Sequence, residues 1–386
     1  MVKKKLKTSI YLVLFLLGIL ILIYLLFKYY SRDIHYLLFY DKIILIGLSI
    51  FIIIFFILFI FEKRKIYEKN GFYSKKIYFL EILFIMFLMV SISSLGGFIY
   101  GYYRYHNPVT SELAIGIYTS YSNEPLNFSS NNINNPVLRY KDVNDVEAYF
   151  VADPFLIYDN ESFFLFFEVT NKNHGKGEIG LATSSDGFNW NYEQIILSED
   201  FHLSYPCVFK WENDYYMIPE SGEKKSIRLY KAINFPYNWR FIKTLLSGET
   251  YSDNTIFNYD NIWWLYTQTR MYDNLKLYYA DIPQGPWFEH PKSPIIEGDA
   301  NIARPGGRVI VFDNRIIRYA QDCDPYYGNQ VWAIEINELS KVDYSEHLIG
   351  NEPVLKGFDN WNTRGMHHIS PIRLANNSWI ASVDGY

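Results

Sequence analysis

Cysteine and charge are both scarce in this sequence. Only two of its 386 residues are cysteines, which excludes a small fold held together by disulfides. Charged residues make up 20% of the chain and hydrophobic residues 49%, and this much apolar surface excludes a disordered chain. The length fits one large domain with an additional segment, or two domains.

Basic residues are few in the C-terminal part of the chain. Residues 105–386 contain 22 Lys and Arg against 36 Asp and Glu, whereas residues 1–104 contain 14 against 5. Nucleic-acid binding requires a basic surface, so we expect no nucleic-acid partner for the acidic part. The chain therefore divides into a basic, apolar N-terminal part and an acidic, aromatic C-terminal part.

Three stretches of 18 or 19 residues in the N-terminal part contain no charged residue. Each is long enough to cross the hydrocarbon layer of a bilayer as an α-helix. We predict transmembrane helices at about residues 8–30, 41–62 and 77–101, so that residues 1–104 form a membrane anchor. The first stretch lacks a small-residue cleavage site and is too long for the apolar core of a signal peptide.

The positions of Lys and Arg predict the orientation of this anchor. Ten of them precede the first helix or lie between the second and third, and four lie on the other side. The positive-inside rule then places the N-terminus in the cytoplasm and residues 105–386 outside it. The helices contain no array of polar residues, which favours a simple anchor over a transporter.

A repeated pattern of paired apolar segments predicts the fold of residues 105–386. The second segments of the five pairs end in polar residues spaced 48 to 63 residues apart, namely Glu168, Glu220, Gln268, Gln321 and Asp384. The first segments open at Asp153, Tyr205, Asp253, Arg304 and Ser370. Asn- and Asp-rich turns separate the paired segments, and their period is close to 2, which indicates β-hairpins. Four strands in each unit of about 50 residues predict an all-β, five-bladed β-propeller.

The polar residues of the paired segments are expected at one rim of the propeller. In an antiparallel hairpin the start of the first strand lies beside the end of the second, so both sets of side chains converge. This many polar side chains exceeds what packing requires, and buried carboxylates are costly unless they are paired. We therefore predict a ligand site, with the alternative that these side chains close the hairpins and tie the blades together.

Carboxyl groups on this rim suit glycoside hydrolysis, which uses one as an acid and another as a base or nucleophile. We predict Asp153, in the string VADPF, as the base and Glu220, in IPES, as the acid. Asp253 is the candidate third acid, which tunes the pKa of the donor through charge repulsion. On this evidence Glu168 would serve equally well as the acid.

Further side chains near the rim are candidates for binding the substrate. They are Glu168, His202, Tyr205, Arg304, Arg308, Asp322, His367 and His368. The two arginines suit an anionic or nucleotide-linked sugar, which keeps a transferase open as an alternative. We expect no metal and no cofactor, and we expect Cys207 and Cys323 to be buried free thiols.

Several unusual strings occur in an order that resembles a known family. They include VADPFLIY, FFLFFE, KGEIGLATSSDGFNW, FHLSYPCVF, YYMIPES, ARPGGR and GMHHIS. About residues 110–386 resemble the N-terminal domain of plant glucosamine inositolphosphorylceramide transferases and its bacterial relatives. That domain resembles the five-bladed propellers of glycoside hydrolase families 43 and 32. In the plant proteins a separate C-terminal glycosyltransferase domain is the catalyst, and this sequence ends at Tyr386 without one, so we do not expect the transferase chemistry.

The hydrolases of family 43 place acids on three blades. The resemblance implies that Asp153 matches the base of the first blade. The second blade opens with Tyr205 instead of an acid, and Asp253 opens the third. The position of the proton donor therefore departs from the pattern of that family.

These observations predict a membrane-anchored protein that acts on glycosidic bonds outside the cytoplasm. Its expected role is in the metabolism of a cell-envelope or surface polysaccharide or of a glycolipid. One alternative is a non-catalytic propeller that binds a glycan, and another is a transferase that uses an activated sugar. The expected partners are a carbohydrate or glycolipid, the lipid bilayer and proteins of envelope polysaccharide synthesis.

Overall fold

The structure is a computed structural model that describes residues 113–269 and 273–386. The three predicted transmembrane helices, at about residues 8–30, 41–62 and 77–101, lie outside the described residues. Within the described residues no helix is long and apolar enough to cross a membrane.

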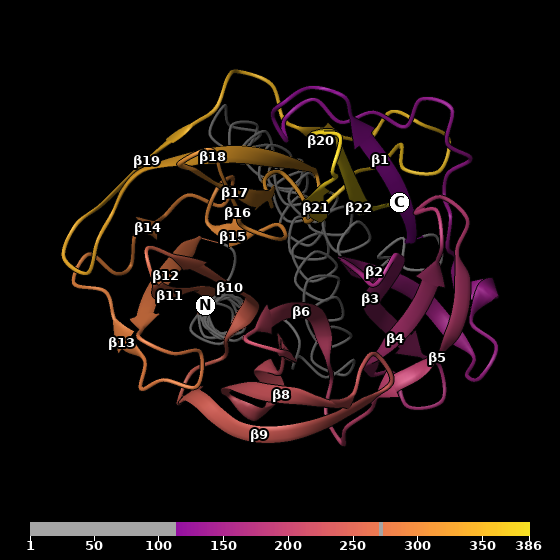
Figure 1. Cartoon of the computed structure of the whole chain (residues 1–386), viewed down its shortest axis with the longest axis horizontal. Helices are drawn as coiled ribbons and strands as arrows, with labels where there is room; N and C mark the ends of the chain where they lie inside the picture. The colour runs from indigo at the N-terminus through magenta and orange to yellow at the C-terminus, as the bar shows by residue number, and fades with distance from the viewer. Residues whose placement is uncertain (1–112, 270–272) are drawn as a thin grey trace, which may run out of the picture. The chain divides into compact units, whose positions relative to one another are not determined.

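Five antiparallel sheets surround a common axis in the order of the chain, which confirms the predicted five-bladed propeller (Figure 1). Blade 1 contains β2 (Ala148–Asp159), β3 (Ser162–Asn171), β4 (Gly177–Ser184) and β5 (Asn191–Leu197). Blade 2 contains β6 (Ser204–Trp211), β7 (Asp214–Glu220), β8 (Ser226–Asn234) and β9 (Asn238–Ser247). Blade 3 contains β10 (Ser252–Tyr259), β11 (Ile262–Gln268), β12 (Asn274–Ala280), β13 (Phe288–Glu289) and β14 (Ile296–Glu297).

The last two blades are less regular. Blade 4 contains β15 (Arg304–Pro305), β16 (Ile310–Phe312), β17 (Arg315–Asp322), β18 (Gln330–Leu339), β19 (Tyr344–Leu348) and β20 (Leu355–Lys356). Blade 5 contains β21 (Ile369–Arg373), β22 (Trp379–Gly385) and β1 (Ala114–Ser120). Two short 3-10 helices, η2 (Tyr140–Asp142) and η3 (Gly222–Lys224), lie in the connections. The first strands of the blades lie nearest the axis in Figure 1.

The turns between paired strands explain why these segments form hairpins. In blade 1 the turn residues Asn160 and Glu161 both have positive φ, and Asp159 pairs with Ser162 across them. Blades 3 and 4 repeat this geometry with Asp-Asn at the two central positions. Two successive residues with positive φ give a turn whose twist matches that of the strands, and Asn and Asp adopt this conformation readily.

Blade 5 closes the ring with strands from both ends of the described chain. β1 pairs with β22 over seven positions, from Ala114 opposite Gly385 to Ser120 opposite Trp379. All seven residues of β1 are buried. The closing blade therefore has three strands, one from the N-terminal side, and the hairpin pattern in the sequence did not predict β1.

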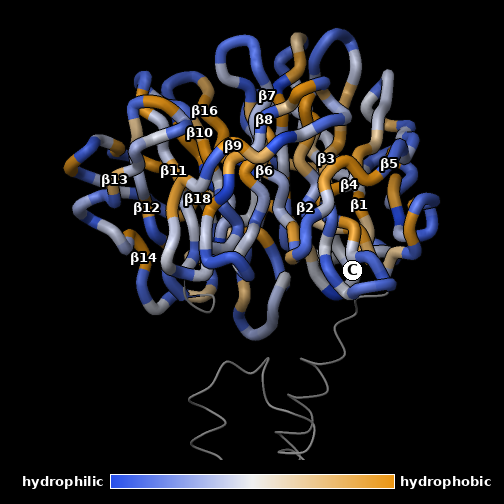
Figure 2. Tube along the Cα trace, turned by 90° about the horizontal axis from the view of Figure 1, so that it is seen from below, coloured by the Kyte–Doolittle hydropathy of each residue, from blue (hydrophilic) through white to orange (hydrophobic). Residues whose placement is uncertain are grey.

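Apolar side chains join the blades to one another. One cluster contains Phe155 of blade 1, Cys207 of blade 2 and Leu265 of blade 3. Hydrophobic residues are concentrated in the strands, whereas the turns are mostly hydrophilic (Figure 2). Cys207 and Cys323 are buried free thiols, as predicted.

A glycine in the short connection after β15 joins three blades near the axis. Gly307 forms a parallel bridge with Ile369 of blade 5, and its N–H donates to the Tyr205 hydroxyl of blade 2 at 2.8 Å. Its φ is 132°, and a Cβ added there would lie 1.8 Å from the Ile369 carbonyl oxygen. Only glycine fits this position.

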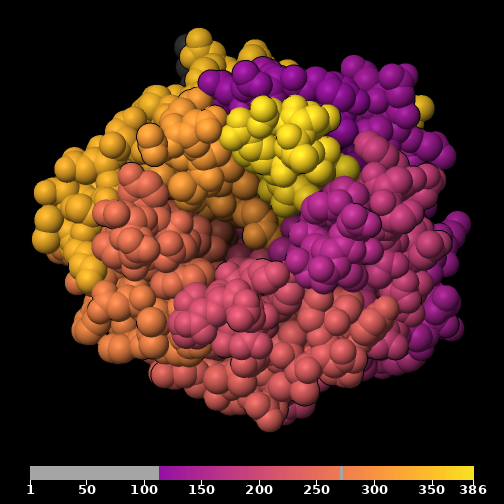
Figure 3. All heavy atoms as spheres, in the orientation of Figure 1, coloured from indigo at the N-terminus to yellow at the C-terminus, as the bar shows by residue number. Residues whose placement is uncertain are grey.

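The face of the molecule shown in Figure 3 is hollowed at the centre of the ring.

Candidate functional site: a carboxylate rim around the axis

Hairpin register brings the predicted rim residues together. In the first four blades the start of the inner strand pairs with the end of the second strand. These pairs are Ala152 with Glu168, Ser204 with Glu220, Ser252 with Gln268, and Arg304 with Gln321. We call Asp153, Glu168, Glu220, Asp253 and Asp384 the carboxylate rim.

Three inner strands share a bulge at this point. Asp153, Tyr205 and Asp253 all have positive φ, between 44° and 53°, and the strand register shifts around each. A bulge re-aims the side chain that it carries, and non-glycine residues rarely adopt positive φ. The same strained geometry therefore recurs in blades 1, 2 and 3 at the opening of the inner strand.

Asp153 lies in a buried group with two residues of blade 5. Its Oδ1 is 3.5 Å from Nε2 of His367, whose Nδ1 is 2.7 Å from Oδ1 of Asp384. The backbone N–H of Asp153 donates to Oδ2 of Asp384 at 2.8 Å. His367 therefore bridges two carboxylates.

His368 stands beside this group on blade 5. Its Nδ1 lies 3.8 Å from Oδ1 of Asp153. Neither of its ring nitrogens has a hydrogen-bond partner, although the side chain is only 1% exposed. Its ring packs edge-on against Phe155 and Tyr205, at centroid distances of 4.8 and 5.1 Å.

Burial and charge set the protonation states of this group. Burial raises the pKa of Asp153 well above its ordinary value; the charge of His367 opposes this shift, and the charges of Asp384 and Asp253 add to it. Burial lowers the pKa of His367, but Asp384 and Asp153 outweigh burial and raise that pKa to about 9. Burial lowers the pKa of His368 to about 3. His367 is therefore an imidazolium at neutral pH, and His368 is a neutral ring.

Ligand atoms of Asp153, His367 and Asp384 lie within 4.8 Å of one another, which is close enough to hold a metal ion. Two carboxylates and an imidazole are ligands that divalent transition metals accept. In the structure, however, each ring nitrogen of His367 faces a carboxylate, so the three side chains also form a chain of ion-pair contacts.

Glu220, Asp253 and Arg304 form a second group on the rim. The backbone N–H of Asp253 donates to Oε2 of Glu220 at 3.0 Å. The Arg304 guanidinium binds the Asp253 carboxylate through Nε and Nη2, the latter at 3.3 Å from Oδ1. Burial, followed by the charge of Asp253, raises the pKa of Glu220 to about 8. A pKa of about 8 makes Glu220 a neutral acid at neutral pH, although its side chain is only half-buried.

Glu168 forms a third group with residues of blade 1 and the loop after it. Its Oε1 accepts a hydrogen bond from the Thr170 hydroxyl at 2.8 Å and lies 3.6 Å from Nε2 of His202. Burial raises the pKa of Glu168, and the charge of His202 opposes that shift. The backbone approaches so closely here that a Cβ at Gly177 would lie 2.8 Å from Oε1 of Glu168.

The groups share one electrostatic field. The negative charges of Asp253 and Glu168 both raise the pKa of Asp153, and the charge of Asp384 raises the pKa of Glu168. Carboxylates from blades 1, 3 and 5 are therefore near enough to oppose one another's ionisation.

Three of the predicted binding residues have other contacts. Tyr205 is only 1% exposed. Its hydroxyl lies 2.8 Å from the Thr255 hydroxyl and accepts a hydrogen bond from the backbone N–H of Gly307. Arg308 donates to the backbone carbonyls of two neighbouring blades at 3.2 Å and to Ser370. Asp322 accepts bonds from the Gln330 amide and the Trp332 indole, at 2.8 and 3.1 Å. All three side chains hold strands or blades together, and the structure does not bring Asp322 into the groups above.

Sequence reasoning gave no role to several residues of these groups. Asp384 was placed on the rim, but its contact with His367 was not anticipated. Thr170 follows Glu168 by two residues and so projects from the same face of β3, a signal that alternation along a strand provides. The ring of Tyr327 lies 5.4 Å from that of His367, centroid to centroid. Tyr327 stands in the loop between β17 and β18, and no repeat in the sequence marks it.

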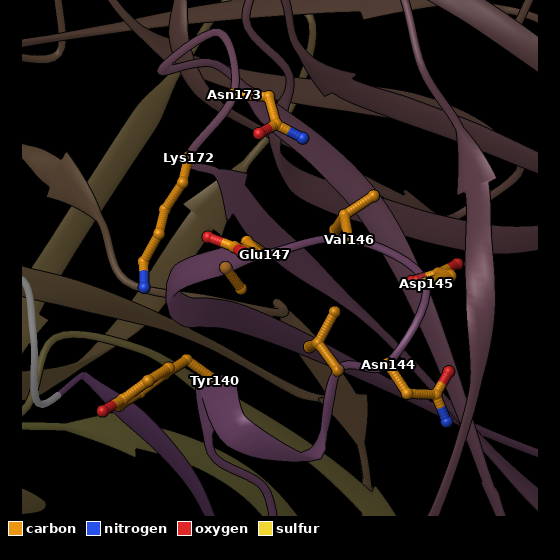
Figure 4. A pocket seen from close by; sticks show the side chains of 9 residues that line it. Tyr140, Asn144, Asp145, Val146, Glu147, Lys172 and Asn173 are labelled. Carbon is orange, nitrogen blue, oxygen red and sulfur yellow. The ribbon is translucent and has the colours of Figure 1, made fainter.

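A cavity of about 500 Å³ lies on blade 1, and no residue of the carboxylate rim lines it (Figure 4). Its walls include Tyr140, Asn144, Glu147 and Lys172, none of which belongs to the groups described above. The Lys172 amino group is 5.7 Å from the centre of the Tyr140 ring. Two carboxylates, Asp145 and Glu147, also line this cavity, together with apolar side chains.

Known proteins resemble the chain in sequence and in part in structure. Two plant proteins named glucosamine inositolphosphorylceramide transferase 1 match it. The one from Oryza sativa subsp. japonica is 41% identical over 246 residues, which are 61% of this chain and 33% of that protein. The one from Arabidopsis thaliana is 35% identical over 265 residues, which are 66% of this chain and 34% of that protein. The chain thus spans about a third of the length of these relatives.

Solved structures of hydrolases match with low identity. A putative glycoside hydrolase from Parabacteroides distasonis ATCC 8503 has a TM-score of 0.48 at 11% identity, covering 65% of this chain and 94% of that one. Zg3597, a family 117 glycoside hydrolase of Zobellia galactanivorans, has a TM-score of 0.43 at 15% identity, covering 71% and 91%.

The match to a family model covers most of the chain. The model is described as glucosamine inositolphosphorylceramide transferase 1, N-terminal, and it matches residues 95–386. These residues include all five blades and every residue of the carboxylate rim. The chain belongs to the family of the N-terminal domain of glucosamine inositolphosphorylceramide transferase 1.

Proposed function

We propose that the propeller binds a carbohydrate at the carboxylate rim and hydrolyses a glycosidic bond there. The observation that carries this proposal is the pairing of a neutral Glu220, whose pKa is raised to about 8, with an Asp153 flanked by the imidazolium of His367. Glycoside hydrolysis needs a proton donor on one side of the bond and a carboxylate on the other. Burial raises the pKa of both groups, and at Asp153 the charge of His367 opposes that shift.

Each residue has a stated part in this reaction. Glu220 protonates the leaving oxygen, and the charge of Asp253 keeps Glu220 protonated until it donates. Asp153 accepts a proton from water or attacks the sugar carbon directly. The His367 imidazolium, fixed by Asp384, opposes the rise that burial causes in the pKa of Asp153, and so acts in favour of the ionised form that this step requires. Glu168, with His202, is the alternative donor.

The proposed substrate class is a glycan or a glycolipid. The names of the plant relatives contain an amino sugar and a ceramide lipid, which supports a glycolipid. Acidic side chains predominate among the described residues of the rim, and the Arg304 guanidinium there is bound to Asp253. This favours a neutral or amino sugar over an anionic one.

A substitution of Asp153 tests the hydrolase proposal. We expect the full-length protein to release reducing sugar from at least one member of a glycan panel, and Asp153→Asn to lose turnover while it retains binding. Loss of both together would indicate damage to the site instead, which circular dichroism and glycan-array binding of the variant distinguish. Binding by both proteins with turnover by neither contradicts hydrolysis.

A non-catalytic glycan-binding propeller is the second candidate function. The Asp253 carboxylate is bound by Arg304, and the Glu220 carboxyl group accepts a hydrogen bond from a backbone N–H. Both side chains therefore have a structural role. Wild-type binding without turnover, unchanged in Asp153→Asn, is the outcome that this alternative predicts.

We also propose that residues 1–104 anchor the propeller in a membrane, with the propeller outside the cytoplasm. The excess of Lys and Arg before the first apolar stretch and between the second and third supports this orientation. Reporter fusions after residues 35, 70 and 386 test it. We expect alkaline phosphatase activity at the first and last positions and fluorescence of a cytoplasmic reporter at the middle one. The reverse pattern contradicts the proposed orientation.

A further inference from the structure

The loop between β17 and β18 lies where two groups of the carboxylate rim meet. The ring of Tyr327 is 5.4 Å from the His367 ring, centroid to centroid, and His367 belongs to the group of Asp153. The Arg304 guanidinium lies over the same ring at 5.0 Å, and Arg304 binds Asp253 beside Glu220. One aromatic side chain therefore contacts both the side of the proposed base and the side of the proposed acid.

The loop is held in one conformation by contacts on both sides. The Tyr386 hydroxyl donates to the backbone carbonyl of Tyr327, and Asn329 donates to the Asp322 carbonyl at 3.1 Å. Gly328 has a φ of 72°, and a Cβ there would lie 2.9 Å from the Tyr386 hydroxyl oxygen. These contacts hold the backbone on both sides of Tyr327, and its ring packs against His367 and Arg304. A backbone that is already held lowers the entropic cost of binding.

Tyr327 also reaches solvent. Its side chain is 36% exposed, and that of its neighbour Tyr326 is 39% exposed, whereas Asp153 and Asp253 are almost fully buried. A hexopyranose has an apolar face of C–H groups and an edge of hydroxyls. An exposed aromatic ring beside buried carboxylates offers a surface for the face and acceptors for the edge.

We propose that Tyr327 forms a sugar-stacking subsite, in which one pyranose ring rests on the phenol ring between the Asp153 and Glu220 groups. The proposal rests on the proposed function in placing the reacting bond at this junction. The bound unit is a pyranose, and Tyr327 contacts it. The subsite does not require hydrolysis, because stacking also serves a propeller that only binds.

The test measures binding and turnover separately on the full-length protein. The probes are neutral tetrasaccharides of the cello-, chito- and galacto-series, and binding is followed by saturation-transfer NMR and titration calorimetry. We expect Tyr327→Ala to weaken binding of at least one probe about tenfold, and Tyr327→Phe to stay within about twofold of the wild type. The phenylalanine variant shows that the ring, and not the hydroxyl, makes the contact.

Tyr140→Ala is the matched control, because Tyr140 is a partly exposed tyrosine in the cavity of Figure 4, whose lining contains no residue of the carboxylate rim. Weakened binding in Tyr140→Ala with unchanged binding in Tyr327→Ala overturns the proposal and places the glycan on blade 1. Absence of binding by every probe also overturns it. Tyr327-dependent binding without turnover by the wild type supports the subsite and contradicts hydrolysis, so the two proposals fail separately.

Discussion

Glu220 and Asp384 occupy the same place in two different blades, at the end of the second strand. Each accepts a hydrogen bond from the backbone N–H of the aspartate that opens the next blade, Asp253 at 3.0 Å and Asp153 at 2.8 Å. Asp384 is fully buried, whereas Glu220 is half-buried. The same carboxylate can therefore tie two blades together and still, where it reaches solvent, be available to a ligand.

Two substitutions of Glu220 separate these roles. Glu220→Gln keeps an oxygen that accepts the Asp253 N–H but cannot donate a proton as an acid. We expect its free energy of unfolding to stay within about 1 kcal/mol of the wild type, while turnover falls at least about a hundredfold. Glu220→Ala leaves the buried N–H unpaired and should also lose about 1–3 kcal/mol of stability.

Urea unfolding and reducing-sugar release measure these two effects of the Glu220 substitutions. Full turnover in Glu220→Gln contradicts the assignment of Glu220 as acid and directs attention to Glu168, which Glu168→Gln then tests. An equal loss of stability in both variants contradicts the tie between blades.

The imidazolium of His367 predicts how stability depends on pH. Its pKa rises from 6.5 in the unfolded chain to about 9 in the fold, so the folded protein holds the extra proton between these values. This contribution is fully present below pH 6.5 and is lost as pH rises to about 9. We therefore expect the stability difference between wild type and His367→Gln to shrink across this window, by up to about 1.4 kcal/mol per pH unit.

Urea unfolding at a series of pH values measures the difference in the free energy of unfolding between wild type and His367→Gln. The matched change His347→Gln, at an exposed histidine, controls for loss of an imidazole elsewhere. A difference that grows with pH between 6.5 and 9 contradicts the bridged imidazolium.

At the scale of single elements, local chemistry made the hairpins predictable. Asn-Asp turns and alternating apolar residues predict the strands on both sides of Asn160 and Asp260, and the observed register places Glu168 and Glu220 where the pattern requires. The bulges at Asp153 and Tyr205 have no such signal, because a bulge depends on contacts with the next blade.

Contacts between blades also explain what the sequence did not reveal about the site. Arg304 lies 51 residues from Asp253, and His367 lies 214 residues from Asp153, so neither contact leaves a periodic trace. Arg308 was expected to bind substrate from its charge alone. Its structural contacts depend on carbonyls of β2 and β6, whose positions only the closed ring determines.

Gly307, in the short connection between β15 and β16, links blade 4 to blades 2 and 5. Gly307→Ala places a Cβ on the Ile369 carbonyl and should lower the free energy of unfolding by about 3 kcal/mol or more. Gly350→Ala is the control, since Gly350 also has positive φ but no atom within 4 Å of the added Cβ. There we expect a loss of about 1 kcal/mol from the backbone alone. Equal losses in the two variants, measured by urea unfolding, contradict the close approach between blades 4 and 5.

The whole propeller depends on closure of the ring between β1 and β22. Sequence patterns identified β22 as part of a hairpin but left β1 without a partner, since residues 114–120 belong to no repeat. β1 pairs with the edge of β22 that would otherwise be free. Each blade then packs against two neighbours, and the ring is expected to unfold as one unit.

Loss of packing in β1 should therefore destabilise blades that it does not contact. Ile117 is fully buried beside β22, and Ile117→Ala should cost about 2–5 kcal/mol. The buried thiols Cys207 in blade 2 and Cys323 in blade 4 report separately on distant parts of the ring when their alkylation is followed by mass spectrometry. We expect both to become reactive at one shared, lower urea concentration in Ile117→Ala, and at an unchanged concentration in the control Ile233→Ala, whose side chain is 58% exposed. Exposure of Cys323 well before Cys207 would show that the blades unfold one after another, which a ring coupled through β1 does not allow.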